Sequence, residues 1–313
     1  MPGWLLESSL LRVIGMKKYR PHFLIVAAAS LWGLISVFVK NLTAIGFSAM
    51  EIVAVRATFA FLLLGFFGMF RRRGELRLDI RHFPYFVGTG IFSIVFFNWC
   101  YFTAINELSV SLAVILLYTA PAFVALLSVL FLKEPFSRRK GWGVAGTMAG
   151  CLLLSGVMDD RLSGSSLFGF AVGLGSGLGY ALYTIFGKFC IRHYSSFATT
   201  LYTFLAASLF LVPYTRLWEK LPLLADGKAL LFSLGLAFVP TVLAYLLYTE
   251  GLRGVDGSVA AVLATVEPVV AFLIGMTLYG ERFAPVQWIG GIVVLLSVLL
   301  VQKEDKGNIG QAG

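Results

Sequence analysis

Long blocks of apolar residues, separated by short polar segments, run along almost the whole chain. A block of about 20 apolar residues is long enough to cross a bilayer core of roughly 30 Å as a helix. Inside a bilayer every backbone polar group must be bonded internally, which favours helices. The pattern predicts ten spanning helices, near residues 22–40, 47–70, 84–105, 109–132, 141–158, 167–190, 196–213, 229–250, 256–279 and 285–301.

Composition supports an all-α integral membrane protein. Hydrophobic residues make up 58% of the 313 residues and charged residues only 13%, whereas soluble domains are nearer half apolar and a quarter charged. The net charge of +9 does not indicate nucleic acid as a partner, because the basic residues cluster in short loops at the ends of the predicted spans. Membrane lipid is the expected surrounding.

The distribution of basic residues predicts the topology. With the N-terminus inside, the inner segments hold eighteen Lys and Arg residues and the outer segments six. Basic residues favour cytoplasmic loops, so both the N-terminal segment 1–21 and the tail 302–313 are expected in the cytoplasm, with the chain in the cell membrane. Residues 1–15 are expected to form a surface segment or to precede the true start, which Met16 resembles.

The chain contains an internal repeat. A shift of 147 residues aligns several positions between the two halves, and near their starts the shift is 148. These pairs are Tyr101 and Tyr248, Ser111 and Ser258, Pro121 and Pro268, Glu134 and Glu281, Trp32 and Tyr180, and Lys40 and Lys188. The repeat predicts two five-helix halves, residues 22–158 and 167–301.

Because five is an odd number, the two halves must lie upside down relative to each other in the membrane. Inverted repeats are typical of secondary transporters, whose binding site lies near the midplane between the repeats. This is the strongest indication of function in the sequence.

The chain resembles the EamA branch of the drug/metabolite transporter superfamily over nearly its whole length. The resemblance depends on Trp32-Gly33, Lys40, Arg56 and the paired segments 121–134 and 268–281. It implies ten helices around a cavity lined mainly by spans 1, 3, 4, 6, 8 and 9, and transport of small metabolites such as amino acids, often outward. It also suggests that spans 5 and 10 could pair two subunits in a homodimer.

The second half departs from this pattern. Tyr180-Ala181 stands where the first half has Trp32-Gly33, and no arginine lies opposite Arg56. Any role of Trp32-Gly33 and Arg56 therefore has no equivalent in the second half.

Glu267 is the first candidate for a functional residue. It lies in span 9 directly before Pro268, which cannot donate to the carbonyl of Ala264. A charged residue at the bilayer centre is costly and usually faces a cavity. Glu267 is expected either to bind an amine or carry a coupling proton, or to satisfy backbone groups freed by the proline.

Glu51 and Arg56 share span 2 at a separation of five residues. One interpretation is an internal ion pair, or a tie to another helix, that holds the bundle together. The alternative is that Arg56 binds the carboxylate of a substrate.

Polar and aromatic residues recur at matched positions. Asn98 and Tyr101 are three residues apart and so share a helical face; their repeat partners are Tyr245 and Tyr248. Tyr118, Trp32 and Tyr180 complete the predicted set of cavity residues, whose aromatic faces could hold an amine by cation–π attraction. The alternative is ordinary packing, because the chain contains 28 Phe and 12 Tyr residues.

Other motifs favour structural roles. Gly169, Gly173, Gly177 and Ala181 form a small-residue stripe that lets helices approach closely. Glu134 and Glu281, at the ends of spans 4 and 9, are expected to cap or tether those ends. Three cysteines and three histidines without ligand spacing indicate no metal and no cofactor.

These features leave three classes of function. A secondary transporter is favoured; the absence of a GxxxxGK[ST] sequence argues against ATP as the direct energy source and leaves a proton gradient or the solute's own gradient. A membrane-embedded enzyme would need a catalytic cluster, and no HExxH motif occurs. A flippase for a lipid or lipid-linked substrate is the alternative that fold alone does not exclude.

Overall fold

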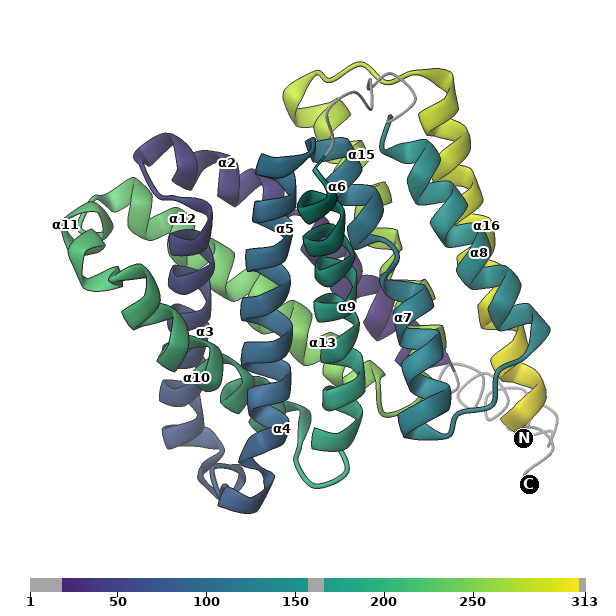
Figure 1. The fold of residues 1–313 in the computed structure, drawn as a ribbon. Coiled ribbons are helices and arrows are strands. Elements are labelled where there is room, and N and C mark those ends of the chain that lie inside the picture. Colours follow the sequence, from purple (N-terminus) through teal and green to yellow (C-terminus); the bar gives the residue numbers. More distant parts are fainter. Residues whose placement is uncertain (1–18, 157–165, 310–313) are drawn as a thin grey trace, which may run out of the picture.

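The computed structural model describes residues 19–156 and 166–309, and the side chains up to residue 302. Within these ranges the chain is all helical, without strands (Figure 1). The predicted surface segment 1–15 lies outside the described residues.

The first half contains five helical segments. The first, Tyr19–Ile45, turns at Leu34 and continues as α2 (Ile35–Ile45). The others are α3 (Ala49–Arg71); α4 (Phe83–Val87), the π-helical η3 (Gly88–Val95) and α5 (Phe96–Glu107); α6 (Val110–Leu117), α7 (Ala120–Leu127) and η4 (Ser128–Leu132); and α8 (Arg138–Leu154). Short 3-10 turns, η1 (Arg73–Glu75) and η2 (Ile80–His82), connect α3 to α4.

The second half repeats this plan. It contains α9 (Leu167–Cys190); α10 (Ser196–Thr215); α12 (Gly227–Ala237), η7 (Phe238–Leu243) and α13 (Ala244–Gly251); α14 (Gly257–Ala264) and α15 (Val266–Tyr279); and α16 (Pro285–Ile309). The short η6 (Leu217–Lys220) and α11 (Leu221–Leu224) connect α10 to α12. The π-helical turns η3 and η7 lie in matched spans of the two halves.

The predicted fold class is confirmed. Nine helices among the described residues are long and apolar enough to cross a membrane. The remaining predicted span corresponds to α8, which has 17 residues and packs along α16. Large apolar side chains such as Phe66 and Phe70 are 64% exposed on the outer surface, as expected for groups that contact lipid.

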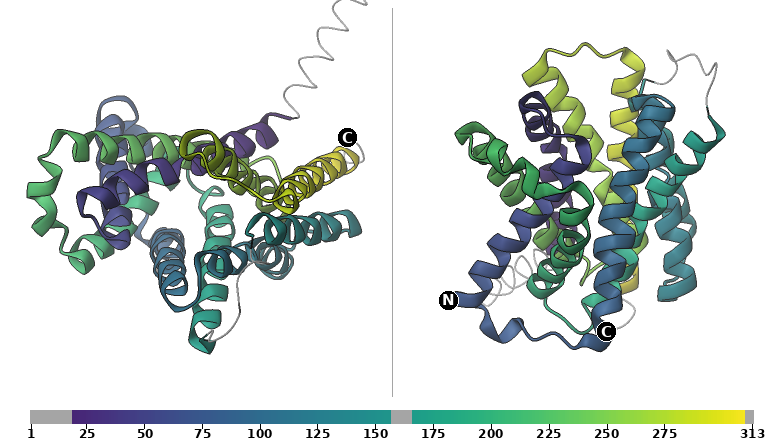
Figure 2. Two further views of the ribbon diagram at one scale, coloured as in Figure 1. Left: turned by 90° about the horizontal axis from the view of Figure 1, so that it is seen from above. Right: turned by 60° about the vertical axis from the view of Figure 1, so that its left-hand side comes forward.

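The halves are arranged as an inverted pair around a central bundle. The connection between α15 and α16 lies at what we call the upper end of the molecule, and its counterpart in the first half, the connection between η4 and α8, lies at the opposite, lower end (Figure 1). At one edge α8 lies along α16, and at the other α3 packs against α10 and α12 (Figure 2). Spans 1, 3, 4, 6, 8 and 9 lie between these edges.

Spans 4 and 9 are both broken near their centres. Each break precedes a proline, Pro121 in α7 and Pro268 in α15, because proline has no amide hydrogen for the helical ladder. At each break a threonine hydroxyl bonds a nearby carbonyl: Thr119 donates to Leu116 and Thr265 to Val262, both at 2.6 Å. Discontinuous helices of this kind form the binding sites of many transporters.

The predicted small-residue stripe packs closely on span 4 and the end of α5. A Cβ atom added to Gly173 would lie 2.3 Å from Leu116, and one added to Gly169 would lie 2.7 Å from Leu108. Gly177 faces the backbone of Leu116 in the same way, at 2.8 Å. The stripe therefore fixes α9 against α6, where both helices border the centre of the molecule.

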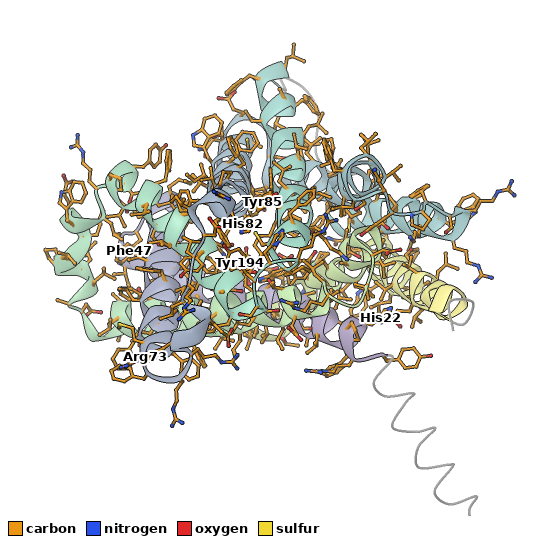
Figure 3. The ribbon with its side chains drawn as sticks, turned by 90° about the horizontal axis from the view of Figure 1, so that it is seen from below. His22, Phe47, Arg73, His82, Tyr85 and Tyr194 are labelled. Atoms are coloured by element: carbon orange, nitrogen blue, oxygen red, sulfur yellow. The ribbon has the colours of Figure 1, made fainter. Side chains whose placement is uncertain are left out.

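The histidines form no metal site in the described part of the chain. At the lower end, His82 and His193 stack with ring centroids 4.3 Å apart. The Nδ1 atom of His82 lies 3.1 Å from the hydroxyl of Tyr194, and Figure 3 shows these two residues beside each other. The three free cysteines are buried, as expected for packing residues.

Candidate functional site

A cavity of about 600 Å³ lies in the middle of the bundle. This volume is within the roughly 300–1,000 Å³ range of small-molecule sites. All nine residues proposed from the sequence line it: Trp32, Arg56, Asn98, Tyr101, Tyr118, Tyr180, Tyr245, Tyr248 and Glu267. The structure brings them together from both halves, and their role in binding remains a prediction.

Aromatic rings form one wall of the cavity. The ring of Trp32 lies 5.0 Å from that of Tyr248, 5.3 Å from Tyr245 and 6.3 Å from Tyr180, measured between centroids. Such tilted and edge-on contacts stabilise the packing of the rings. The indole Nε1 of Trp32 is buried and has no hydrogen-bond partner in the part of the chain that the structure describes, so this wall contains an unused donor.

Glu267 lies just after the break in span 9. It is the second residue of α15, directly before Pro268, and both residues line the cavity. The hydroxyl of Tyr180 donates a hydrogen bond to its Oε2 atom at 3.1 Å. The break in the helix thus places a carboxyl group, held by one phenol, at the cavity wall.

Arg56 is 5% exposed and lines the same cavity. Its Nε atom has no hydrogen-bond partner, and the arginine forms no ion pair with any carboxylate in residues 19–156 and 166–302. Its positive charge is therefore buried without an ion-pair partner in those residues. A buried charge of this kind is rare unless it is functional.

Glu51 and Arg56 form no ion pair with each other in the described residues, so that form of the interpretation is wrong, whereas its other form, a tie to another helix, is confirmed for Glu51. Glu51 accepts the amide of Ser48 at 2.8 Å in the capping box of α3 and pairs with Lys220 at 3.3 Å. A five-residue separation turns the two side chains to different faces of the helix, and η6 supplies a nearer cation. Arg56 is left facing the cavity.

Several cavity residues were missed by the sequence reasoning. Tyr183 and Thr184 line the cavity from α9, and the hydroxyl of Thr184 lies 2.8 Å from that of Tyr248. Tyr183 is three residues after Tyr180, so helical spacing could have identified it. Glu281, expected only to tether a helix end, also lines the cavity towards the upper end.

Two inverted helical repeats around a polar and aromatic central cavity are typical of secondary transporters. The chain belongs to the EamA-like transporter family, whose profile matches residues 20–156 and 167–302. The resemblance stated from the sequence is thereby confirmed.

Several characterised and uncharacterised transporters are similar to this chain. An uncharacterized transporter of Archaeoglobus fulgidus is 29% identical over 280 residues, covering 90% of this chain and 95% of the relative. The threonine/homoserine exporter RhtA of Escherichia coli (strain K12) is 29% identical over 301 residues, covering 90% and 92%. A solved crystal structure matches with a TM-score of 0.77 over 92% of this chain and 98% of its own, at 16% identity; that likeness shows the fold alone.

Proposed function

We propose that this protein is a secondary transporter that exports a small solute carrying both a carboxylate and an amine, an amino acid or a close relative, by alternating access. The observation that carries the proposal is the pair of opposite charges in one cavity. Arg56 and Glu267 both line it, and they form no ion pair with each other in the described residues. A zwitterion between them would complement both.

Arg56 supplies the contact for a carboxylate. A guanidinium presents a fork of donors that matches carboxylate geometry, and hydrogen bonds between charged groups are the strong ones. The Nε atom of this buried guanidinium has no hydrogen-bond partner among the described residues, so a bound carboxylate would replace the hydration that burial removes.

Glu267 supplies the contact for an amine or carries a coupling proton. Its carboxyl group bonds Tyr180, and the ring of Trp32 lies 6.3 Å from that of Tyr180. An ammonium group bound near these rings would gain cation–π attraction. A proton and a substrate ammonium competing for one carboxylate would couple their movements in opposite directions.

The relatives support the solute class and the direction. The similar protein RhtA is described as a threonine/homoserine exporter, and threonine and homoserine each carry one carboxylate and one amine. The excess of basic residues in the predicted inner loops supports a cell-membrane topology with both termini cytoplasmic. In that orientation the upper end faces outward. Membership of a transporter family supports transport over enzymatic chemistry.

Counterflow in proteoliposomes tests the proposal. Vesicles with purified protein are loaded with unlabelled threonine or homoserine, and uptake of the radiolabelled solute is followed against protein-free vesicles. We expect saturable uptake that requires internal solute. Uptake no faster than in protein-free vesicles for a panel of amino acids, with movement of fluorescent lipid instead, would establish the flippase alternative.

A further inference from the structure

Two carboxylates, Glu134 and Glu281, occupy matched positions at opposite ends of the molecule. The amide of Glu134 donates to the carbonyl of Ser128 at 3.2 Å, and the amide of Glu281 donates to that of Gly275 at 3.1 Å. Ser128 and Gly275 are themselves a matched pair of the internal repeat. The backbone turn that presents each carboxylate is therefore the same in the two halves.

At the lower end, Glu134 holds the start of α14. Its Oε2 and Oε1 atoms accept the amide of Gly257 at 2.8 and 3.0 Å. Lys188 lies 3.7 Å from the same carboxylate and donates to the carbonyl of Val255 at 2.5 Å. Glu134 is 11% exposed. We call this contact between Glu134, Lys188 and the segment 255–257 the lower latch.

The internal repeat places the counterpart of the lower latch at the upper end. Glu281 corresponds to Glu134, Lys40 to Lys188, Val110 to Gly257 and Leu108 to Val255. Lys40 and Glu281 form an ion pair at 3.2 Å, but within the described ranges the amide of Val110 makes no bond to Glu281 and Lys40 makes none to the carbonyl of Leu108. We call this incomplete set the upper latch.

The upper latch is also open to its surroundings. The side chains of Lys40 and Glu281 are 52% and 47% exposed, and Val110 is 60% exposed. Val110 and Glu281 both line the cavity, whereas Glu134, Lys188 and Gly257 do not. The cavity thus extends to the upper latch and is shut off at the lower one.

Each latch pairs a glycine with a larger residue, but the glycine lies on opposite partners: it is Gly257 of α14 at the lower latch and Gly275 of α15 at the upper latch. At the lower latch, a Cβ atom on Gly257 would lie 2.6 Å from the hydroxyl of Ser128, so a larger residue here would displace Ser128 or loosen the contact. At the upper latch the larger residue is Val110, and the residue matching Ser128 is Gly275. Gly275 removes the side chain that Val110 would otherwise meet, which is the size relation expected if α6 docks there.

We propose that the upper and lower latches close in alternation. When the lower end is open, Glu281 accepts a hydrogen bond from the amide of Val110 and closes the upper end. This inference rests on the proposed alternating access and identifies its gating contacts. In the present state the lower latch is formed. In the other state Glu134 releases Gly257 while α6 docks on Glu281. A carboxylate is well suited to this role because helix N-termini present free amides and a partial positive charge.

The two latches stabilise different states of one molecule, so each latch shifts the same equilibrium between those states in the opposite direction. Weakening the lower latch therefore favours closure of the upper end, and weakening the upper latch has the opposite effect. A role of both carboxylates as static tethers would instead lower stability in each case without opposite shifts.

A distance measurement across the upper mouth distinguishes these roles. Spin labels are placed at Asn106→Cys and Arg282→Cys, both exposed, after replacement of the three native cysteines by alanine, and pulsed electron resonance gives the distance distribution. We expect Glu134→Gln to raise the short-distance population roughly tenfold relative to the long one, the size expected for losing a hydrogen bond to a charged group. In a double variant that also carries Glu281→Gln, the short-distance population should fall again.

Two further variants keep the test decisive. Gly257→Val should act like Glu134→Gln because it blocks the lower latch sterically, and Glu51→Gln, which removes a carboxylate outside both latches, should leave the distribution unchanged. Shifts of the same sign for Glu134→Gln and Glu281→Gln, or no shift in variants that remain monodisperse, would overturn the proposal. Because no solute is added, failure of the latches is distinguishable from failure of amino-acid transport in the counterflow assay.

Discussion

The two repeats share a backbone plan but contribute different chemistry to the cavity. The residues they have in common, such as the paired prolines and the Lys and Glu residues at the span ends, lie at helix breaks and at the two mouths. Arg56 and Glu267, the two charged residues proposed to bind the solute, are not repeated. The second half has Thr203 and Phe204 at the positions matching Arg56, and the first half has Ala120 where the second has Glu267.

This difference separates two tasks. Symmetric residues serve the exchange between two equivalent states, which requires each half to make the same contacts in turn. Asymmetric residues recognise a solute that itself has two unlike ends. Changes to the unrepeated charges should therefore affect binding most, and changes to the repeated residues should affect the balance and rate of the conformational exchange.

The largest effect is expected for Glu267→Gln. Loss of a buried charge that pairs with the ammonium group should reduce amino-acid affinity by about 30-fold or more, since breaking a buried charge pair costs roughly 2–5 kcal/mol. Isothermal titration with threonine and homoserine measures this. Glu51→Gln is the matched control, because Glu51 pairs with Lys220 away from the cavity, and its affinity should equal that of the unmodified protein.

Arg56→Met should separate binding from stability. Affinity for the carboxylate should fall by about tenfold or more, the size of a hydrogen bond to a charged group. The melting temperature of the solute-free protein should rise by a few degrees, because an uncompensated buried charge is replaced by an apolar side chain of similar length. A lower melting temperature would show that Arg56 has a structural partner instead.

Pro268→Ala is expected to slow transport. The restored amide can donate to the carbonyl of Ala264 and make span 9 continuous, so the break moves less readily and counterflow should fall several-fold while solute affinity changes little. Pro213→Ala provides the control, because Pro213 also lies inside a helix, α10, but outside the cavity. Equal slowing in both variants would contradict a special role for the break.

The smallest effect concerns the loop at the lower end. A hydrogen bond from the Ser195 hydroxyl, and then the nearby Arg72, lower the pKa of Glu75 below its usual 4.5. A lowered pKa in the folded state contributes stability above the pKa of the unfolded chain, and this contribution is lost as the pH falls through the folded-state value. Glu75→Gln should slightly reduce the loss of melting temperature between pH 6 and pH 4, measured by differential scanning fluorimetry.

The sequence predicted the fold and the paired aromatic residues of the cavity because both follow from the repeat, whereas Arg56 and Glu267 stand out as ionisable residues inside apolar spans. The apolar blocks and the constant shift between matched positions define two inverted halves, and pairs such as Tyr101 and Tyr248 then converge on one centre. The partner of Glu51 was not predictable in this way. Lys220 is far from Glu51 in the sequence and comes from η6, a short turn that hydropathy does not reveal.

The position of Glu281 shows a second limit. Its place at the end of span 9 correctly indicated a tether, since it pairs with Lys40. Its contribution to the cavity wall depends on which mouth is open in this state, and a sequence pattern common to both halves contains no information about that choice.

The central claim is that Arg56 and Glu267 together bind a zwitterion, and thermal-shift binding tests it most directly. Purified protein is heated with threonine or homoserine, and with forms of each whose amine is acetylated or whose carboxylate is an amide. A ligand at a hundred times its dissociation constant should stabilise the folded state by about 2.7 kcal/mol. We expect a raised melting temperature with the parent amino acids and an unchanged one with either blocked form. Equal shifts with the parent and both blocked forms, or no shift with any amino acid, would contradict it.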